Sequence, residues 1–143
     1  MANTIPVNYE LQFEPLFHNF TFKGMEIITT SLSKATDSII LDAAELKIKK
    51  CHVEQGTKII TANASLNEKN ERLTIKLSKK IKGKAKLCIR FTGVLNDRLL
   101  GFYKSQYKDN KGKTKYLATT QFEAADARRA FPCWDEPAVK ATF

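Results

Sequence analysis

Apolar and polar residues alternate along most of the chain, and this two-residue period limits the possible folds more than any other feature of the sequence. The alternation is clearest over residues 9–13, 73–77 and 85–91. It is typical of strands with one buried face, because successive side chains of a strand point to opposite sides of the sheet. Before residue 123, no window of 11 or more residues has the spacing of an amphipathic helix. We therefore expect an all-β fold, either an antiparallel β-sandwich or an open sheet.

Two places interrupt the alternation. Gly24 breaks it and the pattern resumes with Met25 and Ile27, so we expect a bulge or a bend at the glycine. Between Ile48 and Cys51 the phase of the pattern slips by one residue. We expect strands on both sides of each interruption.

Two further segments have a clear local pattern. The polar, glycine-containing loop at residues 109–113 is flanked by strand-like segments, which predicts a β-hairpin over residues 102–121. Phe102 and Tyr103 in this hairpin are expected to form a cross-strand aromatic pair, and the alternative is that they line a substrate channel. We interpret the Lys-rich run Lys79–Lys86 as the solvated edge of a hairpin that prevents pairing between sheets.

The last part of the chain differs from the rest. Ala and Arg are good helix formers, which predicts one short helical turn at Ala124–Ala130, ended by Pro132. Val139–Phe143 begins another strand-like run, and the chain stops inside it. We therefore interpret residues 1–143 as one β domain and as a fragment of a longer protein.

The composition is that of a globular protein with a basic balance. Lys and Arg exceed Asp and Glu by 24 − 15 = 9, which permits contact with nucleic acid or anionic lipid but does not determine the fold. No apolar run is long enough to span a membrane, and the first residues do not resemble a signal peptide. Cys51, Cys88 and Cys133 are an odd number of widely spaced cysteines, which favours reduced thiols and a cytoplasmic location.

Residues 120–137 form the most unusual segment, with four carboxylates, two arginines and the only tryptophan. Arginines next to carboxylates form bidentate pairs that can hold a loop without strand partners. We expect such structural ion pairs, and not catalysis, from Arg128, Asp126, Asp135 and Glu136. Cys133 is expected to be packed in the core. The alternative is that one carboxylate of the segment stays unpaired and faces a cleft in which it holds a cation.

The same segment resembles the gluzincin-type zinc aminopeptidases, the family of puromycin-sensitive aminopeptidase and the tricorn-interacting factors. The family pattern T-Q-F-E-x-x-x-A-R-x-x-F-P-C-x-D-E-P matches Thr120–Pro137 without a gap, and Leu100–Ser105 and Phe20–Gly24 resemble two weaker family segments. The resemblance implies an N-terminal, saddle-like β domain that covers the active-site cleft of a catalytic zinc domain. That catalytic domain is expected beyond residue 143. The resemblance further implies that Glu123 binds the α-ammonium group of a peptide substrate and that Gln121 lines the pocket for its N-terminal side chain.

These roles are reasonable on physical grounds. The positive charge is the feature unique to the amino end of a peptide, so a fixed carboxylate in a partly dry cleft can recognise that end. A charged hydrogen bond of this kind is worth roughly 1.5–3 kcal/mol, and it also positions the first peptide bond. The neutral amide of Gln121 can donate or accept a hydrogen bond without adding a second charge.

The chain lacks the zinc-binding motif of such enzymes. The motif H-E-x-x-H places two imidazoles one helical turn apart, whereas His18 and His52 are the only histidines and neither has a second histidine four residues later. Cys51 next to His52 is a single pair and not a metal site. We therefore expect zinc in the full-length enzyme, none bound by this fragment, and no activity of the fragment alone.

Three alternatives remain open. A lipid-epoxide hydrolase branch of the same superfamily has Gln where this chain has Glu123, so the acidic residue favours peptides. The chain could instead be a basic β-sandwich that binds nucleic acid or a protein without catalysis, although Lys79–Lys86 contains no aromatic residue for base stacking. It could also be a degenerate homologue that serves as a scaffold. The expected partners are peptide substrates, through their N-terminus, and the catalytic domain, with no nucleic acid and no membrane.

Overall fold

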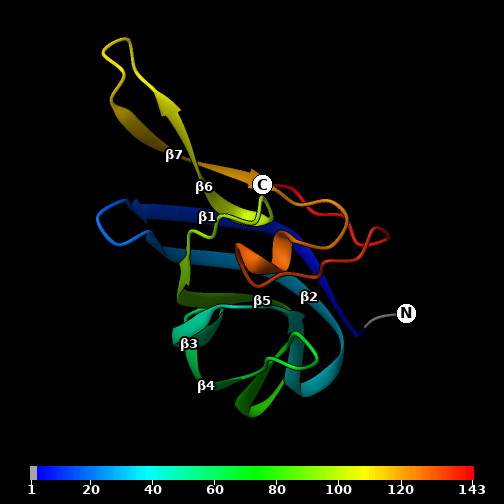
Figure 1. Ribbon diagram of the computed structural model, residues 1–143. Helices are drawn as coiled ribbons and strands as arrows, with labels where there is room; N and C mark the ends of the chain where they lie inside the picture. Colours follow the sequence, from blue (N-terminus) through cyan, green and yellow to red (C-terminus); the bar gives the residue numbers. More distant parts are fainter. Residues whose placement is uncertain (1–2) are drawn as a thin grey trace.

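A computed structural model describes residues 3–143 and consists of two antiparallel sheets and one short 3-10 helix (Figure 1). Five strands form the larger sheet in the order β1-β2-β5-β3-β4, and β6 and β7 form the smaller one. The all-β expectation is confirmed. The elements are β1 (Thr4–Leu16), β2 (Thr21–Asp42), β3 (Lys47–Gln55), β4 (Lys58–Asn67), β5 (Arg72–Val94), β6 (Gly101–Lys108), β7 (Thr114–Gln121) and η1 (Ala127–Arg129).

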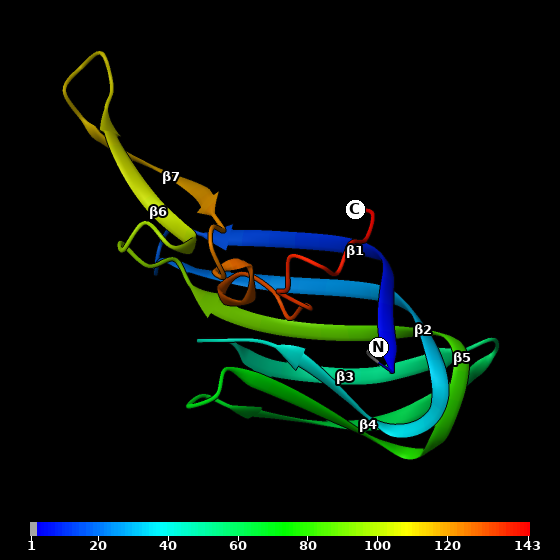
Figure 2. The same cartoon turned by 90° about the vertical axis from the view of Figure 1, so that its right-hand side faces the viewer.

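The larger sheet curls (Figure 2), and its longest strand, β5, pairs with β2 on one side and with two different strands in turn on the other. Residues 86–92 of β5 pair with β3, whereas residues 72–77 of the same strand pair with β4. The apolar faces of the two halves enclose the core between them. Its fully buried side chains include Ile28, Ile39, Leu41, Ile60, Leu73, Ile75, Leu87 and Ile89.

Lys79–Lys86 is not part of a hairpin, because the run lies inside the long strand β5. Residues 78–85 of β5 nevertheless pair with neither β3 nor β4, so the run does form an open edge on that side. Its lysines are exposed, whereas Ile81 and Ala85 are buried on the core side. On the side of the run without a strand partner, the amide of Gln55 donates to two carbonyl oxygens of the run, at 2.8 and 3.3 Å. A polar run can therefore lie within a long sheet strand, since its lysine side chains still reach solvent.

The expected interruption at Gly24 is also wrong, because β2 stays in register with both neighbours there. A Cβ atom at Gly24 would lie 2.2 Å from the ring of Phe91, so the glycine makes room for that aromatic side chain. The alternation continues without a shift, and Glu26 faces the core instead of Met25 and Ile27. Glu26 is fully buried.

Three of the four remaining local expectations are confirmed. The phase slip is confirmed as a register shift between Ile48 and Lys50, and the hairpin is confirmed as β6 and β7. The helical turn is confirmed in the shorter form of η1. Val139–Phe143 is not a strand, because only Thr142 pairs, through a single parallel bridge to Asn8 on the edge of β1.

The β6–β7 hairpin extends away from the larger sheet, and the base of β6 is anchored in the core (Figure 1). Phe102 is buried there, with ring centroids 5.3 Å from Phe13 and 5.0 Å from Phe22. It therefore serves packing and does not form a pair with Tyr103, whose strand partner is Thr119. Within residues 3–143, none of the helical structure is long and apolar enough to cross a membrane.

Candidate functional site

Two arginines in η1 hold the segment 120–137 against the larger sheet. The Arg128 guanidinium is mostly buried, and its Nε atom lies 3.0 Å from Asp135 Oδ2. Its Nη1 atom lies 3.2 Å from Glu71 Oε2 and 3.6 Å from Asp42 Oδ1. Asp42 is buried, so this network compensates a carboxylate that would be costly to leave alone in the interior.

Arg129 forms a second set of ion pairs. Its Nη1 atom lies 2.7 Å from Glu45, its Nη2 atom 2.9 Å from Glu71, and its Nε atom 2.8 Å from Asp126. The expected structural role of Arg128, Asp126 and Asp135 is thus confirmed. Glu136 differs, because it is exposed and takes no part in the ion pairs found among residues 3–143.

Backbone contacts fix the same segment to the end of β2. Asp42 and Cys133 exchange two hydrogen bonds, with N···O distances of 2.7 and 3.0 Å, and the Ala44 N–H donates to the Arg128 carbonyl at 3.0 Å. The backbone N–H of Trp134 donates to the Tyr9 hydroxyl at 3.3 Å. These hydrogen bonds fix the segment 120–137 to the larger sheet although most of it has no regular secondary structure.

Cys133 is packed in the core, as expected, with 4% of its surface exposed. Burial raises the pKa of its thiol far above the usual range. A neutral buried thiol is a poor nucleophile, so Cys133 contributes packing and not chemistry.

Glu123 differs from the other carboxylates near the arginines. It follows β7 by two residues, lies in the turn before η1 and is exposed. Within residues 3–143 its carboxylate takes part in no ion pair and no side-chain hydrogen bond, and both guanidinium groups contact other acids instead. The charge at position 123 is therefore free to bind a cation from outside the domain.

Gln121 is the last residue of β7 and is also exposed. It pairs across the hairpin with Gly101, which has a φ angle of +65°. A side chain at Gly101 would be strained, and its Cβ atom would lie 2.7 Å from the Cβ atom of Arg129. The close approach of β6 to η1 thus holds Gln121 in position, two residues before Glu123.

A cavity of about 220 Å³ lies beside this turn, between β1 and the C-terminal segment. Its walls include Ala124, Trp134 and Glu136, together with Tyr9 and Phe143. The rings of Tyr9 and Phe143 are stacked with centroids 5.1 Å apart. Glu123 lies two residues after the end of β7, and the next residue, Ala124, lines this cavity.

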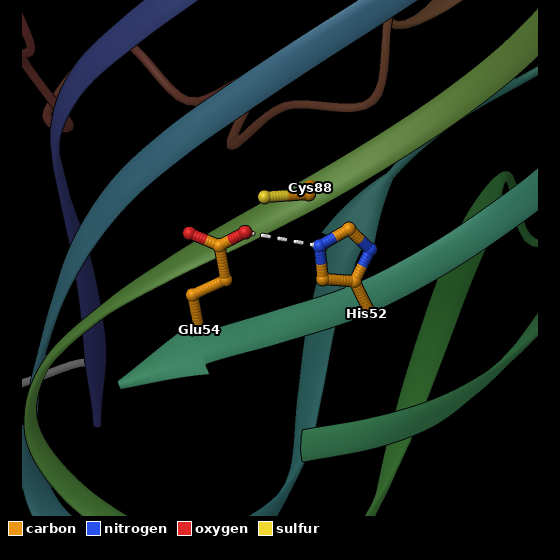
Figure 3. A group of neighbouring side chains, drawn as sticks. All are labelled: His52, Glu54 and Cys88. Carbon is orange, nitrogen blue, oxygen red and sulfur yellow. Dashed lines mark hydrogen bonds and ion pairs between the residues drawn. The ribbon is translucent and has the colours of Figure 1, made fainter. Parts of the chain in front are cut away.

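A separate group of reactive side chains lies on the outer face of β3 and β5, where sequence patterns did not reveal it (Figure 3). His52, Glu54 and Cys88 each offer one donor atom, and the three atoms lie within 4.8 Å of one another. His52 and Glu54 are two residues apart on one strand, so the face they share could have been inferred from the sequence. The proximity of Cys88 depends on the strand register, which has no local signal.

The chain's own residues do not fit the zinc site of an aminopeptidase. His18 belongs to the connection between β1 and β2, and His52 lies within β3, so neither occupies a helix from which two imidazoles could bind one ion. The segment 120–137 supplies carboxylates but no imidazole. The groups that this segment can offer are those of a binding site for a charged organic ligand.

Comparisons with known proteins place this geometry in context. The sequence profile of the Peptidase M1 N-terminal domain matches residues 5–143. The chain is 42% identical to Aminopeptidase 2 of Candida albicans over 144 residues, which cover 99% of this chain and 15% of that protein. It is 40% identical to the puromycin-sensitive aminopeptidase of Caenorhabditis elegans over 141 residues (96% and 15%) and 41% identical to Aminopeptidase M1 of Arabidopsis thaliana over 145 residues (97% and 16%). The chain thus spans less than a fifth of the length of these relatives.

Proposed function

The chain belongs to the Peptidase M1 N-terminal domain family, which confirms the resemblance carried by residues 120–137, and we propose that its Glu123 binds the α-ammonium group of peptide substrates. The protein that contains this domain would then be an aminopeptidase that removes single residues from the N-terminus of peptides. Relatives that carry the name aminopeptidase support this activity.

The observation that carries the proposal is the unpaired state of Glu123. Arg128 and Arg129 together contact five other carboxylates, those of Asp42, Glu45, Glu71, Asp126 and Asp135. A carboxylate next to two guanidinium groups would ordinarily be neutralised by them. Both arginines thus contact other carboxylates, and Glu123 is exposed and unpaired within residues 3–143.

The arrangement suits recognition of a chain end. An ammonium group can donate up to three hydrogen bonds, and a fixed carboxylate receives them in a geometry that orients the adjoining peptide bond. Gln121, two residues before Glu123, adds a neutral amide, which can contact the N-terminal side chain of the substrate without attracting a second cation.

Hydrolysis itself requires groups outside this chain, and we assign none of its steps to residues 1–143. The zinc ion of the proposed enzyme would be held by a catalytic domain beyond residue 143. We accordingly propose that the isolated chain has no peptidase activity. Its part in the reaction is to bind and orient the substrate.

Kinetics of the full-length protein test the role of Glu123. Glu123→Gln removes the charge at nearly constant volume, and loss of a charged hydrogen bond worth roughly 1.5–3 kcal/mol should lower kcat/KM by about 10- to 150-fold. Glu10→Gln is the control, because Glu10 is an exposed glutamate on β1 that does not line the cavity beside the turn. A kcat/KM value that falls equally in both variants, or in neither, would refute the assignment.

A further inference from the structure

The outer face of β3 and β5 brings together three side chains whose donor atoms suit a transition-metal ion (Figure 3). His52 and Glu54 point to the same side of β3, since they are two residues apart in a strand. Cys88 is the direct strand partner of His52 on β5. All three are partly buried, and their strands belong to the centre of the larger sheet, so little backbone freedom would be lost on binding.

The distances between the donor atoms are close to those between the ligands of a bound zinc ion. His52 Nε2 lies 3.2 Å from Glu54 Oε1, and two such ligands of a tetrahedral zinc ion are about 3.3 Å apart. The Cys88 sulfur lies within 4.8 Å of both donor atoms, whereas about 3.6 Å is needed, a difference that side-chain rotation can close. The ion would replace the present contact between the imidazole and the carboxylate.

We propose that His52, Glu54 and Cys88 bind one divalent transition-metal ion of the zinc class, with water as the fourth ligand. An imidazole, a thiolate and a carboxylate are the ligand types that zinc uses, and a thiolate excludes Mg²⁺ and Ca²⁺. A cavity of about 180 Å³ borders the three side chains and leaves room for the water ligand. Three ligands from this chain and one solvent molecule complete a tetrahedron.

The charges of the site balance when the ion is bound. The Cys88 thiol loses its proton to solvent on binding, so that one thiolate and one carboxylate neutralise the two positive charges of the ion. Lys50 and Arg90 also border the cavity, and Lys86 is the strand partner of Glu54, so these cations moderate the affinity. In the free protein, burial and the nearby Glu54 charge raise the pKa of Cys88, and a bound cation relieves that repulsion.

Cobalt provides a spectroscopic test on the purified 143-residue chain under reducing conditions. Co²⁺ bound to a thiolate gives a charge-transfer band in the near ultraviolet, and the titration should saturate at one ion per chain and be reversed by Zn²⁺. Cys88→Ser should abolish the band and weaken binding by more than about 100-fold. A smaller loss, of about 10- to 100-fold, is typical of altering a residue that only hydrogen-bonds to a metal ligand. His52→Ala should weaken binding as well.

Cys51→Ser is the matched control, because Cys51 is adjacent to His52 in sequence and therefore faces the opposite side of the sheet. This variant should keep the band and the affinity. A second readout needs no variant, since Zn²⁺ should slow the alkylation of Cys88 in the unmodified chain and leave that of Cys51 unchanged. Absence of the band from the unmodified chain, its persistence in Cys88→Ser, its loss in Cys51→Ser, or equal alkylation of Cys88 with and without Zn²⁺ would each overturn the proposal.

Discussion

Glu26 should make the stability of the domain fall as the pH rises through the weakly acidic range. Its side chain is fully buried, and neither carboxylate oxygen has a hydrogen-bond partner within residues 3–143. Burial without a partner disfavours the charged form and raises the pKa of Glu26 well above its ordinary value of 4.5. The folded chain therefore keeps a proton that the unfolded chain releases, and folding is favoured at lower pH.

The size of the effect follows from proton linkage. At any pH between the unfolded-state and the folded-state pKa of Glu26, the carboxyl is mostly ionised in the unfolded chain and protonated in the folded one, so the free energy of unfolding should decrease by up to about 1.4 kcal/mol per pH unit from this group alone. Burial raises the pKa values of Tyr9, Cys51 and Cys133, so all three stay neutral in the weakly acidic range. They therefore add nothing to the slope.

Urea unfolding of the unmodified chain and of Glu26→Gln measures the effect as a difference. The amide does not titrate, so the free energy of unfolding of Glu26→Gln relative to the unmodified chain should rise with pH above about pH 4.5, by up to about 1.4 kcal/mol per pH unit. Glu10→Gln, at an exposed glutamate of the neighbouring strand β1, is the control and should show no such change. Parallel pH profiles for the unmodified chain and Glu26→Gln would contradict a protonated, buried Glu26.

Two further variants test the packing that positions the site. Within residues 3–143, Arg128→Met leaves the buried Asp42 with Arg72 as its only basic partner, and it should lower the free energy of unfolding by about 3 kcal/mol in urea titrations. A loss below about 1 kcal/mol would show that the network is not stabilising. Gly24→Ala places a methyl group against the Phe91 ring and should cost about 1–3 kcal/mol by the same assay. Phe91→Leu in the same chain should recover part of that loss, whereas additive losses would refute the contact.

Much of the fold follows from local patterns in the sequence. Period-two alternation identified the strands of the larger sheet and the β6–β7 hairpin, because each strand's buried face is recorded in its own residues. The same reasoning failed at Lys79–Lys86 and at Glu26. Charge favours an edge or solvent, whereas the structure continues one long strand through the lysine run and the phase of β2 places a carboxyl in the core.

The sequence names candidate site residues but not the ion pairs around them. The segment 120–137 carries the family pattern within itself, so Gln121 and Glu123 are candidates from the sequence alone. The pairing of Arg128 and Arg129 with Glu45 and Glu71 has no local signal, because these glutamates are more than fifty residues away. The group on β3 and β5 depends in the same way on a strand register.

A thermodynamic cycle in the full-length protein tests the contact between Glu123 and the substrate amine most directly. Binding of a non-hydrolysed peptide analogue is compared with that of the same analogue lacking its α-amine, in the unmodified protein and in Glu123→Gln. We predict a coupling energy of roughly 1.5–3 kcal/mol, because removing the amine should matter only while the carboxylate is present. A coupling energy near zero would mean that Glu123 does not hold the substrate amine.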